Sequence, residues 1–333
     1  MPPKMEKIAT ASVPAPQPQP QTTQAARIWT TLDLINWTKD YFNKKGIESA
    51  RLEAELLLAA VLDCARIRLY VDFEKSVAPE KLAQFREYVK RRGEKREPLQ
   101  YILGRTEFID LRLKITPAVL IPRPETELLA LWAAERVKEF AAASPISSGA
   151  GAEAKLAGIP VLDLCTGSGC LALYLAAKEP RVHATATDIS DTALALASEN
   201  AKALGLDSRV AFLQGDLFEA LPVECKGSFE ILVANPPYID STTRGSLPPE
   251  VRDHEPAAAL FADEGGLGIL RRIVKTAPDW LRPGGCFGLE FGIGQGDALK
   301  ELAGQSGAFE QLEILQDSAK LPRMLVGRRK KFQ

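Results

Sequence analysis

The sequence predicts an α/β fold, in which a mostly parallel sheet is covered by helices on both faces and follows a smaller helical domain. Between Thr30 and Gly93, apolar residues recur at helical spacing, whereas beyond Gly158 short β-branched runs alternate with helical segments. Alternation of this second kind is typical of parallel sheets. The chain has 333 residues, which is too many for one ordinary domain and suits two.

Three amphipathic helices are expected in the first part. In the first of them Leu34, Trp37 and Tyr41 lie at i, i+3 and i+7, and Gly46 is placed to end the helix. The other two are expected at residues 49–63 and, beginning with a proline in the first turn, at residues 79–93. Three helices with apolar faces predict a bundle with a core of its own.

A β-hairpin is expected to join the two parts. Residues 106–122 alternate apolar and polar side chains around Thr116-Pro117, which predicts the turn of the hairpin there. A helix follows from Glu125 to about Ala142. The strands of the sheet are expected at residues 159–164, 182–187, 209–213, 229–234, 285–291, 309–315 and 323–328. Because a short loop joins the last two strands, they should pair antiparallel at an edge.

These patterns divide the chain into four parts. Residues 1–26 are rich in Pro, Gln and Ala, have little to bury, and are expected to be a disordered tail. A helical domain is expected at 27–104, a hairpin linker at 105–124, and an α/β domain at 125–333. Within the last, the Ser/Gly/Ala-rich stretch 144–157 is expected to be a surface insertion.

Composition excludes several classes of protein. The net charge of −1 and the pI of about 6.3 argue against avid nucleic-acid binding, which needs a basic surface. Five cysteines without a C-x-x-C pair and only two histidines favour a reduced, cytoplasmic protein without a zinc site. The longest apolar run, residues 56–62, is too short to span a membrane, and no apolar leader follows Met1. We expect a monomer, since no long exposed apolar stripe is evident.

The stretch "VLDLCTGSGCLA" (161–172) predicts a nucleotide-binding loop. A strand carrying Asp163 turns through glycines into a helix, so the backbone can approach a ligand closely at the helix N-terminus. The next strand ends at Asp188, whose carboxylate can accept hydrogen bonds from both hydroxyls of a ribose. A third strand ends in "QGDLF", where Asp216 can receive an adenine amino group and Leu217 can pack on the ring. The loop also satisfies a dinucleotide fingerprint, so a nicotinamide enzyme fits it equally well.

The stretch "VANPPYID" (233–240) favours a different chemistry. Two prolines end the fourth strand abruptly, because proline has no N–H to donate to a sheet. The side-chain oxygen of Asn235 and the carbonyl of Pro236 can each accept one N–H of a planar –NH₂ group, and would hold its nitrogen in line with a sulfonium methyl. Pro237 stiffens the turn, and Tyr238 can pack against the flat group. No strong general base is needed, since the alkylated nitrogen loses its proton readily.

Together these motifs resemble a known family. "NPPY" with "DLCTGSG" is similar to the class I S-adenosylmethionine-dependent amino methyltransferases. "PLQYILGRTEFIDLRLKITPAVLIPRPETELL" (98–129), "EVRDHEPAAALFADEGGLGILRRIV" (250–274) and "LEFGIGQG" (289–296) resemble the HemK/PrmC family, which methylates a glutamine of peptide chain release factors. The resemblance covers roughly residues 30–330. It implies an N-terminal helical bundle, a hairpin linker and a Rossmann-like seven-stranded catalytic domain.

The resemblance also implies a substrate and a site. The substrate would be the glutamine in the Gly-Gly-Gln loop of class I release factors, with S-adenosylmethionine as methyl donor. Asn235, Pro236 and Tyr238 would be the catalytic residues, joined by Pro237 and Arg123 in holding the glutamine. The cofactor would be held by Asp163, Cys165, Thr166, Gly167, Ser168, Gly169, Asp188, Asp216, Leu217 and Asn235.

Two positions depart from the family pattern. Cys165 stands where relatives often carry glycine, and Leu217 stands where some carry an aromatic residue. "HEP" (254–256) suggests an acid–base pair, but we interpret His254 as a surface or capping residue, and Glu290 as structural or close to the cofactor. Three other functions fit part of the pattern: a nucleic-acid amino methyltransferase using the same turn, a nicotinamide oxidoreductase, and a non-catalytic binding protein.

Overall fold

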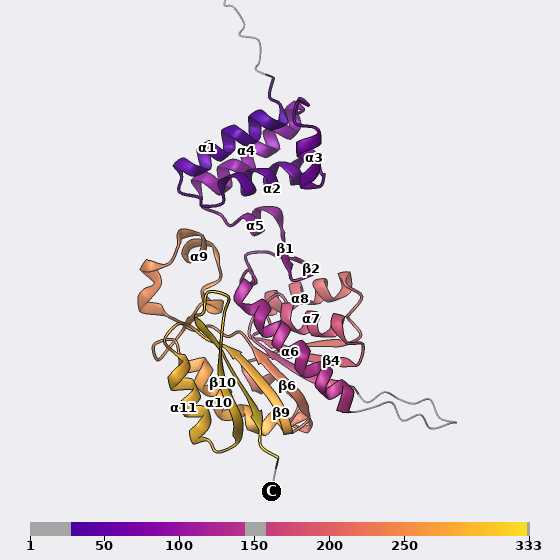
Figure 1. The fold of residues 1–333 in the computed structure, drawn as a ribbon, viewed down its shortest axis with the longest axis vertical. Coiled ribbons are helices and arrows are strands. Elements are labelled where there is room, and N and C mark those ends of the chain that lie inside the picture. The colour runs from indigo at the N-terminus through magenta and orange to yellow at the C-terminus, as the bar shows by residue number, and fades with distance from the viewer. Residues whose placement is uncertain (1–27, 144–157, 332–333) are drawn as a thin grey trace, which may run out of the picture.

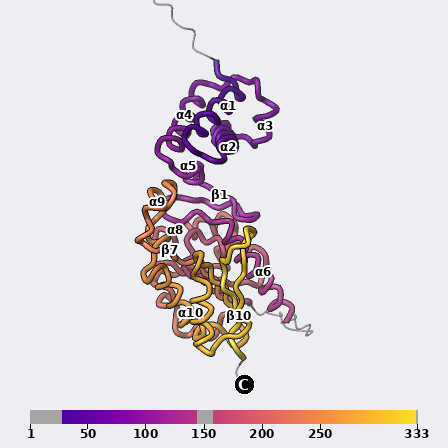
Figure 2. The backbone as a smooth tube through the Cα atoms, turned by 60° about the vertical axis from the view of Figure 1, so that its left-hand side comes forward, coloured from indigo at the N-terminus to yellow at the C-terminus, as the bar shows by residue number. Residues whose placement is uncertain are grey.

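A helical bundle is stacked on one end of an α/β domain (Figure 1). This computed structural model describes residues 28–143 and 158–331. The expected tail at 1–26 and the expected insertion at 144–157 both lie outside the described residues. In the turned view of Figure 2 the bundle again occupies one end, and α5, β1 and α9 lie where it meets the α/β domain. The predicted order of a helical part followed by an α/β part is therefore confirmed.

The bundle contains the three predicted helices and two short ones. The helices are α1 (Thr31–Lys44), α2 (Ala50–Leu62), α3 (Arg66–Val71), α4 (Pro79–Glu94) and α5 (Leu99–Leu103). Helix α1 begins with a capping box, since Thr30 and Asp33 each accept a hydrogen bond from the other's backbone N–H. Helices α3 and α5 are too short for an apolar period to indicate them. The core of the bundle contains Phe42, Leu57 and Phe85, which are almost fully buried.

The hairpin exists, but its predicted turn is wrong. Strands β1 (Arg105–Phe108) and β2 (Leu111–Lys114) pair antiparallel, and the turn between them is Ile109-Asp110. Ile109 has φ 55°, a left-handed conformation that β-branched residues rarely adopt, so its identity carries no turn signal. Its N–H donates to the Glu127 carboxylate at 3.0 Å, which helps to hold this conformation. Thr116-Pro117 does form a turn, but after the hairpin.

Seven strands form the main sheet in the order β10-β11-β9-β6-β3-β4-β5. They are β3 (Ile159–Leu164), β4 (Val182–Asp188), β5 (Val210–Gln214), β6 (Phe229–Ala234), β9 (Leu281–Glu290), β10 (Phe309–Gln316) and β11 (Pro322–Arg329). Strand β11 pairs antiparallel with both β9 and β10, and β10 lies at the edge, as predicted. The first and fourth strands, β3 and β6, are parallel neighbours, so their carboxyl ends meet at one place.

Helices cover the sheet on both faces. Adjacent residues of one strand enter different cores, since Val161 packs with α6 (Pro124–Ala143) and α7 (Cys170–Lys178), whereas Leu162 packs with α10 (Gly268–Trp280). This alternation is the pattern of a strand buried on both sides. The remaining helices of this domain are α8 (Asp191–Ala203), α9 (Pro249–His254) and α11 (Gly296–Gln305). None of the helices in the described part of the chain is long and apolar enough to cross a membrane.

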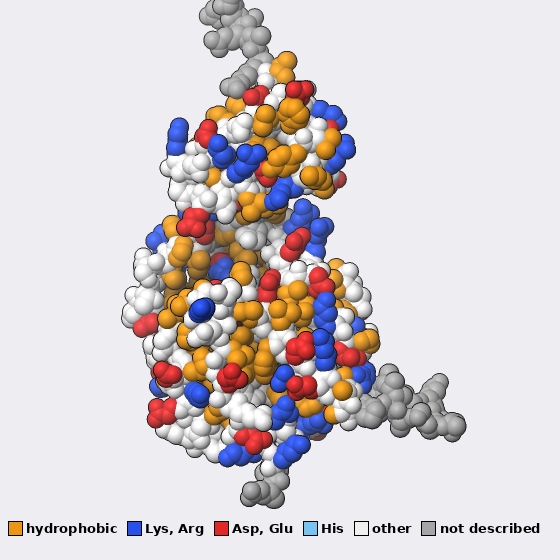
Figure 3. Space-filling model, viewed as in Figure 1, with side chains coloured by type: hydrophobic (Ala, Val, Ile, Leu, Met, Phe, Trp, Pro, Cys, Tyr) orange, Lys and Arg blue, Asp and Glu red, His pale blue; other side chains and the backbone are white. Residues whose placement is uncertain are grey.

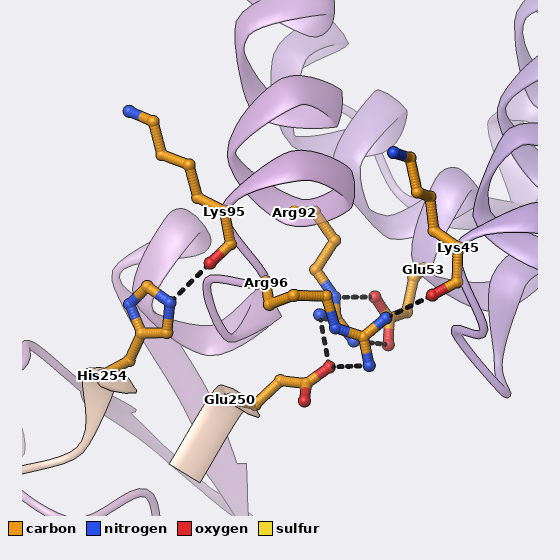
Figure 4. Close-up of polar contacts among 7 residues, drawn as sticks. All are labelled: Lys45, Glu53, Arg92, Lys95, Arg96, Glu250 and His254. Carbon is orange, nitrogen blue, oxygen red and sulfur yellow. Dashed lines mark hydrogen bonds and ion pairs between the residues drawn. The ribbon is translucent and has the colours of Figure 1, made fainter. Parts of the chain in front are cut away.

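Ion pairs join the bundle to the segment that follows β6. This segment contains two short parallel strands, β7 (Ile239–Asp240) and β8 (Phe261–Ala262), with α9 between them. Arg92 of α4 donates to Glu53 of α2 at 2.5 Å and to Glu250 of α9 at 2.9 Å (Figure 4). Arg96 also pairs with Glu250, at 2.6 Å. We call these four residues the bridge. Elsewhere on the face shown in Figure 3, positive and negative side chains are interspersed.

Candidate active site

A cavity of about 260 Å³ lies beyond the carboxyl ends of β3, β4 and β6. It is the place where an open α/β sheet binds its ligand, because the strand order reverses there. Nine of the predicted site residues line it: Cys165, Thr166, Gly167, Ser168, Asp188, Asp216, Leu217, Asn235 and Pro237. The wall is completed by the segment after the hairpin, by Thr126 of α6, and by residues of the stretch 256–269. The structure thus brings the predicted nucleotide loop and the predicted amide-binding turn into one cavity.

The loop between β3 and α7 has an unusual backbone. Gly167 and Gly169 have φ +56° and +83°, in the left-handed region that glycine enters without strain. Cys165 also has a positive φ, 57°. This conformation explains why glycine suits the position and why cysteine is a departure there. Burial raises the pKa of the Cys165 thiol well above its usual value, so the side chain is a neutral part of the wall.

Asp163 supports this loop from behind the cavity wall. Its side chain is fully buried, and Oδ2 accepts hydrogen bonds from the Thr166 hydroxyl at 2.6 Å and from the Ala172 N–H at 3.2 Å. Burial raises its pKa to about 7, against the opposing effect of these two bonds. Its second oxygen, Oδ1, is buried without a hydrogen-bond partner among the described residues. Because Asp163 is buried and does not line the cavity, it supports the loop and does not face a ligand.

Two further carboxylates face the cavity. Asp188, at the end of β4, accepts the Gly167 N–H at 2.9 Å on one oxygen and the Ser190 N–H at 3.0 Å on the other. Each of these oxygens has a second lone pair, which matches a ligand with two hydroxyl groups. Asp216 accepts a hydrogen bond from Arg272 at 2.8 Å and remains partly exposed. Leu217, beside it, is buried and has φ 53°.

Hydrogen bonds hold both ends of the "NPPY" turn. The Asn235 side-chain Nδ2 donates to the Thr126 hydroxyl at 2.8 Å, and that hydroxyl donates to Glu290 Oε2 at 2.7 Å. At the other end, the Tyr238 hydroxyl donates to Glu290 Oε1 at 3.1 Å. Since the Nδ2 end of Asn235 is occupied, Oδ1 is the end of its amide left available to a ligand. The turn therefore offers an acceptor to the cavity.

The backbone of Tyr238 is held as closely as its side chain. The Gln295 amide donates to the Tyr238 carbonyl at 2.9 Å and accepts the Gly292 N–H at 2.8 Å. Gly266, at φ +86°, passes so close that a Cβ there would lie 2.1 Å from the same carbonyl oxygen. Burial raises the pKa of the Tyr238 phenol, which therefore stays protonated and donates to Glu290. Few degrees of freedom remain in this turn.

Arg123, His254 and Glu255 lie outside the cavity wall, whereas Pro256 of "HEP" lines it. Arg123 donates to Glu255 at 2.5 Å, and it is Pro122 beside it that lines the cavity. Burial raises the pKa of Glu255, against the opposing charge of Arg123. The ring Nε2 of His254 hydrogen-bonds to the Lys95 carbonyl at the end of the bundle, 2.7 Å away. Within the described residues, no group of three His, Cys, Asp or Glu side chains could hold a metal ion.

Thr126 was missed by the sequence analysis, and the contact of Glu290 with the turn was not foreseen. Both residues lie within stretches that carry the family resemblance, Thr126 in "IPRPETE" and Glu290 in "LEFGIGQG". Their place in these stretches was the one sign in the sequence that the two residues belong to the site. No spacing rule connects them, since they stand 164 residues apart in the chain and meet through the packing of α6 against β9.

Known proteins match both the helical part and the α/β part of the chain. A family model described as "PrmC N-terminal domain" matches residues 33–104, and one described as "Methyltransferase small domain" matches residues 153–247. The chain is 41% identical over 306 residues to a release factor glutamine methyltransferase of Geobacter sulfurreducens, covering 92% of this chain and 99% of that protein. It is 38% identical over 297 residues to one of Rhodopirellula baltica, covering 89% and 95%.

Solved structures confirm the fold. The catalytic domain of hMettl16, solved in complex with MAT2A 3'UTR hairpin 6, matches with a TM-score of 0.50 at 13% identity, over 78% of this chain and 86% of that chain. The sheet is that of class I S-adenosylmethionine-dependent methyltransferases, as the resemblance implied. At this level of identity the match bears on architecture alone.

Proposed function

Because the chain belongs to the release factor glutamine methyltransferase family, we propose that it transfers a methyl group from S-adenosylmethionine to a glutamine side-chain nitrogen of a class I peptide chain release factor. The glutamine is that of the Gly-Gly-Gln loop. The observation that carries the proposal is the Asn235 amide, which presents Oδ1 as the acceptor in a cavity shared with a nucleotide-binding loop.

The described residues fit S-adenosylmethionine. Asp188 offers two carboxylate oxygens for a ribose, and Asp216 and Leu217, which line the same cavity, would receive the adenine amino group and ring. The left-handed loop 165–169 completes the cradle, and the buried Asp163 holds that loop in place through its hydrogen bonds to Thr166 and Ala172. When bound there, the cofactor supplies a methyl group on a positively charged sulfur. We propose these residues, with Thr166, Ser168 and Asn235, as the cofactor site.

The protein's own contribution is to orient the glutamine. A carboxamide nitrogen is a poor nucleophile because its lone pair is delocalised into the carbonyl. The Asn235 oxygen and the Pro236 carbonyl each accept one of its N–H groups, which fixes the nitrogen and stabilises the positive charge that develops on it. Pro237 stiffens the turn, and the Tyr238 ring, held by Glu290, packs against the flat amide. Arg123 acts at a distance, by holding Glu255 beside the wall.

Transfer of labelled methyl groups tests this function. The protein is incubated with methyl-labelled S-adenosylmethionine and, in separate reactions, with a release factor, with its Gly-Gly-Gln Gln→Ala variant, and with DNA and RNA. We expect label on the release factor and none on its variant, which differs by one side chain. Label on nucleic acid would instead establish the nucleic-acid amino methyltransferase, which the named relatives do not favour.

We further propose that the protein acts in the cytoplasm as a monomer, that it forms no stable complex with nucleic acid, and that the helical domain at 27–104 recognises the body of the release factor. All five cysteines are free thiols in the structure, which suits a reducing compartment. The interspersed charges of Figure 3 suit a protein partner better than a polyanion. Light scattering measures the oligomeric state, and a filter-binding titration with RNA measures nucleic-acid affinity.

A further inference from the structure

A chain of hydrogen bonds leads from the cavity wall into the core and connects both ends of the "NPPY" turn to one carboxylate. It runs from Asn235 through Thr126 to Glu290, and from Glu290 to Tyr238. Its members come from the end of β6, from α6 and from β9. Thr126 and Glu290 are each 1% exposed, so water does not compete for these bonds.

The direction of each bond in the chain follows from the carboxylate. In the structure the hydroxyls of Thr126 and Tyr238 both donate to Glu290, which is the arrangement that an ionised carboxylate requires because it can only accept. A hydroxyl has a single hydrogen. Once Thr126 has donated it to Glu290, its oxygen can only accept from Asn235, and the Asn235 amide must turn its NH₂ toward Thr126. Its oxygen is then directed away from this chain of bonds.

The orientation matters because the two ends of a carboxamide have nearly the same shape. Without a directional partner, an asparagine can occupy its site either way round. One way round, Asn235 offers its oxygen to the N–H groups of the substrate amide. The other way round, it opposes those N–H groups with its own, and two donors face each other. The turn can hold a glutamine for transfer in the first orientation alone.

We propose that Thr126 and Glu290 are positioning residues, which fix the Asn235 amide with its oxygen toward the substrate. The inference rests on the proposed function, which supplies the amide that Asn235 must accept. It gives a reason for a charged residue in an apolar core, where a Leu or Met would be the less costly choice. The same carboxylate fixes the Tyr238 hydroxyl, so one side chain positions both ends of the turn.

The test compares Thr126→Val with Thr126→Ser. Valine has nearly the shape of threonine but no hydroxyl, whereas serine keeps the hydroxyl and loses a methyl. Thr38→Val is the matched control, because Thr38 is equally buried in the bundle and its hydroxyl has no hydrogen-bond partner among the described residues. Each variant is assayed with release factor and with S-adenosylmethionine for kcat, KM and cofactor affinity.

Thr126→Val should lower kcat by roughly 10- to 100-fold, because the Asn235 amide would no longer hold the substrate amide in the orientation needed for transfer. Its KM for the release factor should stay within about threefold, because a protein substrate contacts far more surface than one amide. Thr126→Ser should recover most of the kcat, and Thr38→Val should match the wild type. A Val variant that turns over like the wild type, or a Ser variant as slow as Val, would overturn the proposal. If the wild type itself transfers no methyl to release factor, the proposed function is what fails.

NMR supplies a readout that does not depend on activity. In protein with ¹⁵N-labelled asparagine, the Asn235 side-chain N–H bound to Thr126 should exchange slowly with solvent in the wild type and in Thr126→Ser, and quickly in Thr126→Val. If Thr126→Val fails to fold, Glu290→Gln replaces it in the same measurement. The new amide can donate a hydrogen bond to Thr126, so the hydrogen bonds between residues 290, 126 and 235 can reverse their direction. Unchanged exchange in a folded variant would refute the positioning role.

Discussion

The polar groups behind the cavity and those of the bridge use carboxylates in opposite ways. Glu290 and Asp163 are buried among neutral hydroxyl and amide donors, and burial raises the pKa of each to about 7. Glu250 of the bridge faces Arg92 and Arg96. Burial would raise its pKa too, but the hydrogen bond and charge of Arg92, with the charge of Arg96, outweigh that effect and lower it.

These two environments of a carboxylate suit different roles in the protein. A carboxylate bound by neutral donors gains little from Coulomb attraction, and its directional hydrogen bonds fix the orientation of its neighbours. A carboxylate between two guanidinium groups gains most from their charges, which attract it over a range of orientations. The first arrangement suits a site that must hold one amide correctly. The second suits the attachment of one domain to another, and the following predictions test this distinction.

The largest effect is expected where the orienting network ends, at Asn235. Asn235→Ala should lower turnover by about 100- to 1,000-fold, equivalent to about 2–4 kcal/mol of transition-state stabilisation, because it removes a preorganised acceptor. S-adenosylmethionine should still bind with nearly normal affinity, because the loop 165–169, Asp188 and Asp216 supply most of its proposed contacts and Asn235 only one of them. Steady-state kinetics and calorimetric titration of the cofactor measure the two quantities, and full turnover by the variant would disprove the role of the turn.

The two kinds of carboxylate should give opposite slopes of stability against pH. Glu290 has a folded pKa of about 7, above its ordinary value of 4.5, so the folded state binds more protons between these values and stability falls as pH rises through them. Glu290→Gln should remove this fall, which amounts to roughly 3 kcal/mol. Glu250, with a lowered pKa, contributes stability above pH 4.5 that is lost as pH falls below it, and Glu250→Gln should remove that loss.

Urea unfolding of the two variants and the wild type, at a series of pH values from 3 to 8, measures both slopes. The comparison between the two regions fails if Glu290→Gln and Glu250→Gln change the slope in the same direction.

A smaller effect is expected at the bridge. Arg92→Gln should lower the free energy of unfolding by about 1–3 kcal/mol, because it leaves Glu53 without its partner in a nearly buried position and takes one of two cations from Glu250. Arg96→Gln, where the arginine is more exposed, should cost less. Chemical denaturation measures both. If Arg92→Gln reduced turnover as much as Asn235→Ala, the bridge would belong to the catalytic machinery.

The smallest effect is expected at an ion pair that is neither buried nor near the site. Lys114 and Glu199 pair at 2.6 Å with both side chains 56% exposed. Lys114→Ala should change the free energy of unfolding by less than about 0.5 kcal/mol, since solvent screens such pairs. This variant is the baseline for the bridge. If it lost as much free energy of unfolding as Arg92→Gln, burial would not explain the larger effect expected at the bridge.

Much of the fold could be predicted because its signals are local. The strand at 229–234 was bounded correctly by an apolar run and two prolines, and α4 begins at the proline that marked it. The antiparallel pairing of the last two strands followed from their short connection. The hairpin turn was misplaced because its residue, Ile109, holds a left-handed conformation that its side chain disfavours. Tertiary contacts overrode local preference there.

By itself, the sequence determined the order of the elements and the positions of the two turns that line the cavity, and it predicted a nucleotide site at the first and an amide site at the second. Each of these depends on residues close together in the chain, through periodicity, glycine conformation and the missing N–H of proline. The tertiary structure alone decided that Thr126 meets Asn235 and Glu290, which stand 109 and 164 residues away. Hydrogen bonds of that range depend on how α6 packs on the sheet, and no local pattern specifies that packing. That packing therefore decided which end of the Asn235 side-chain amide faces Thr126.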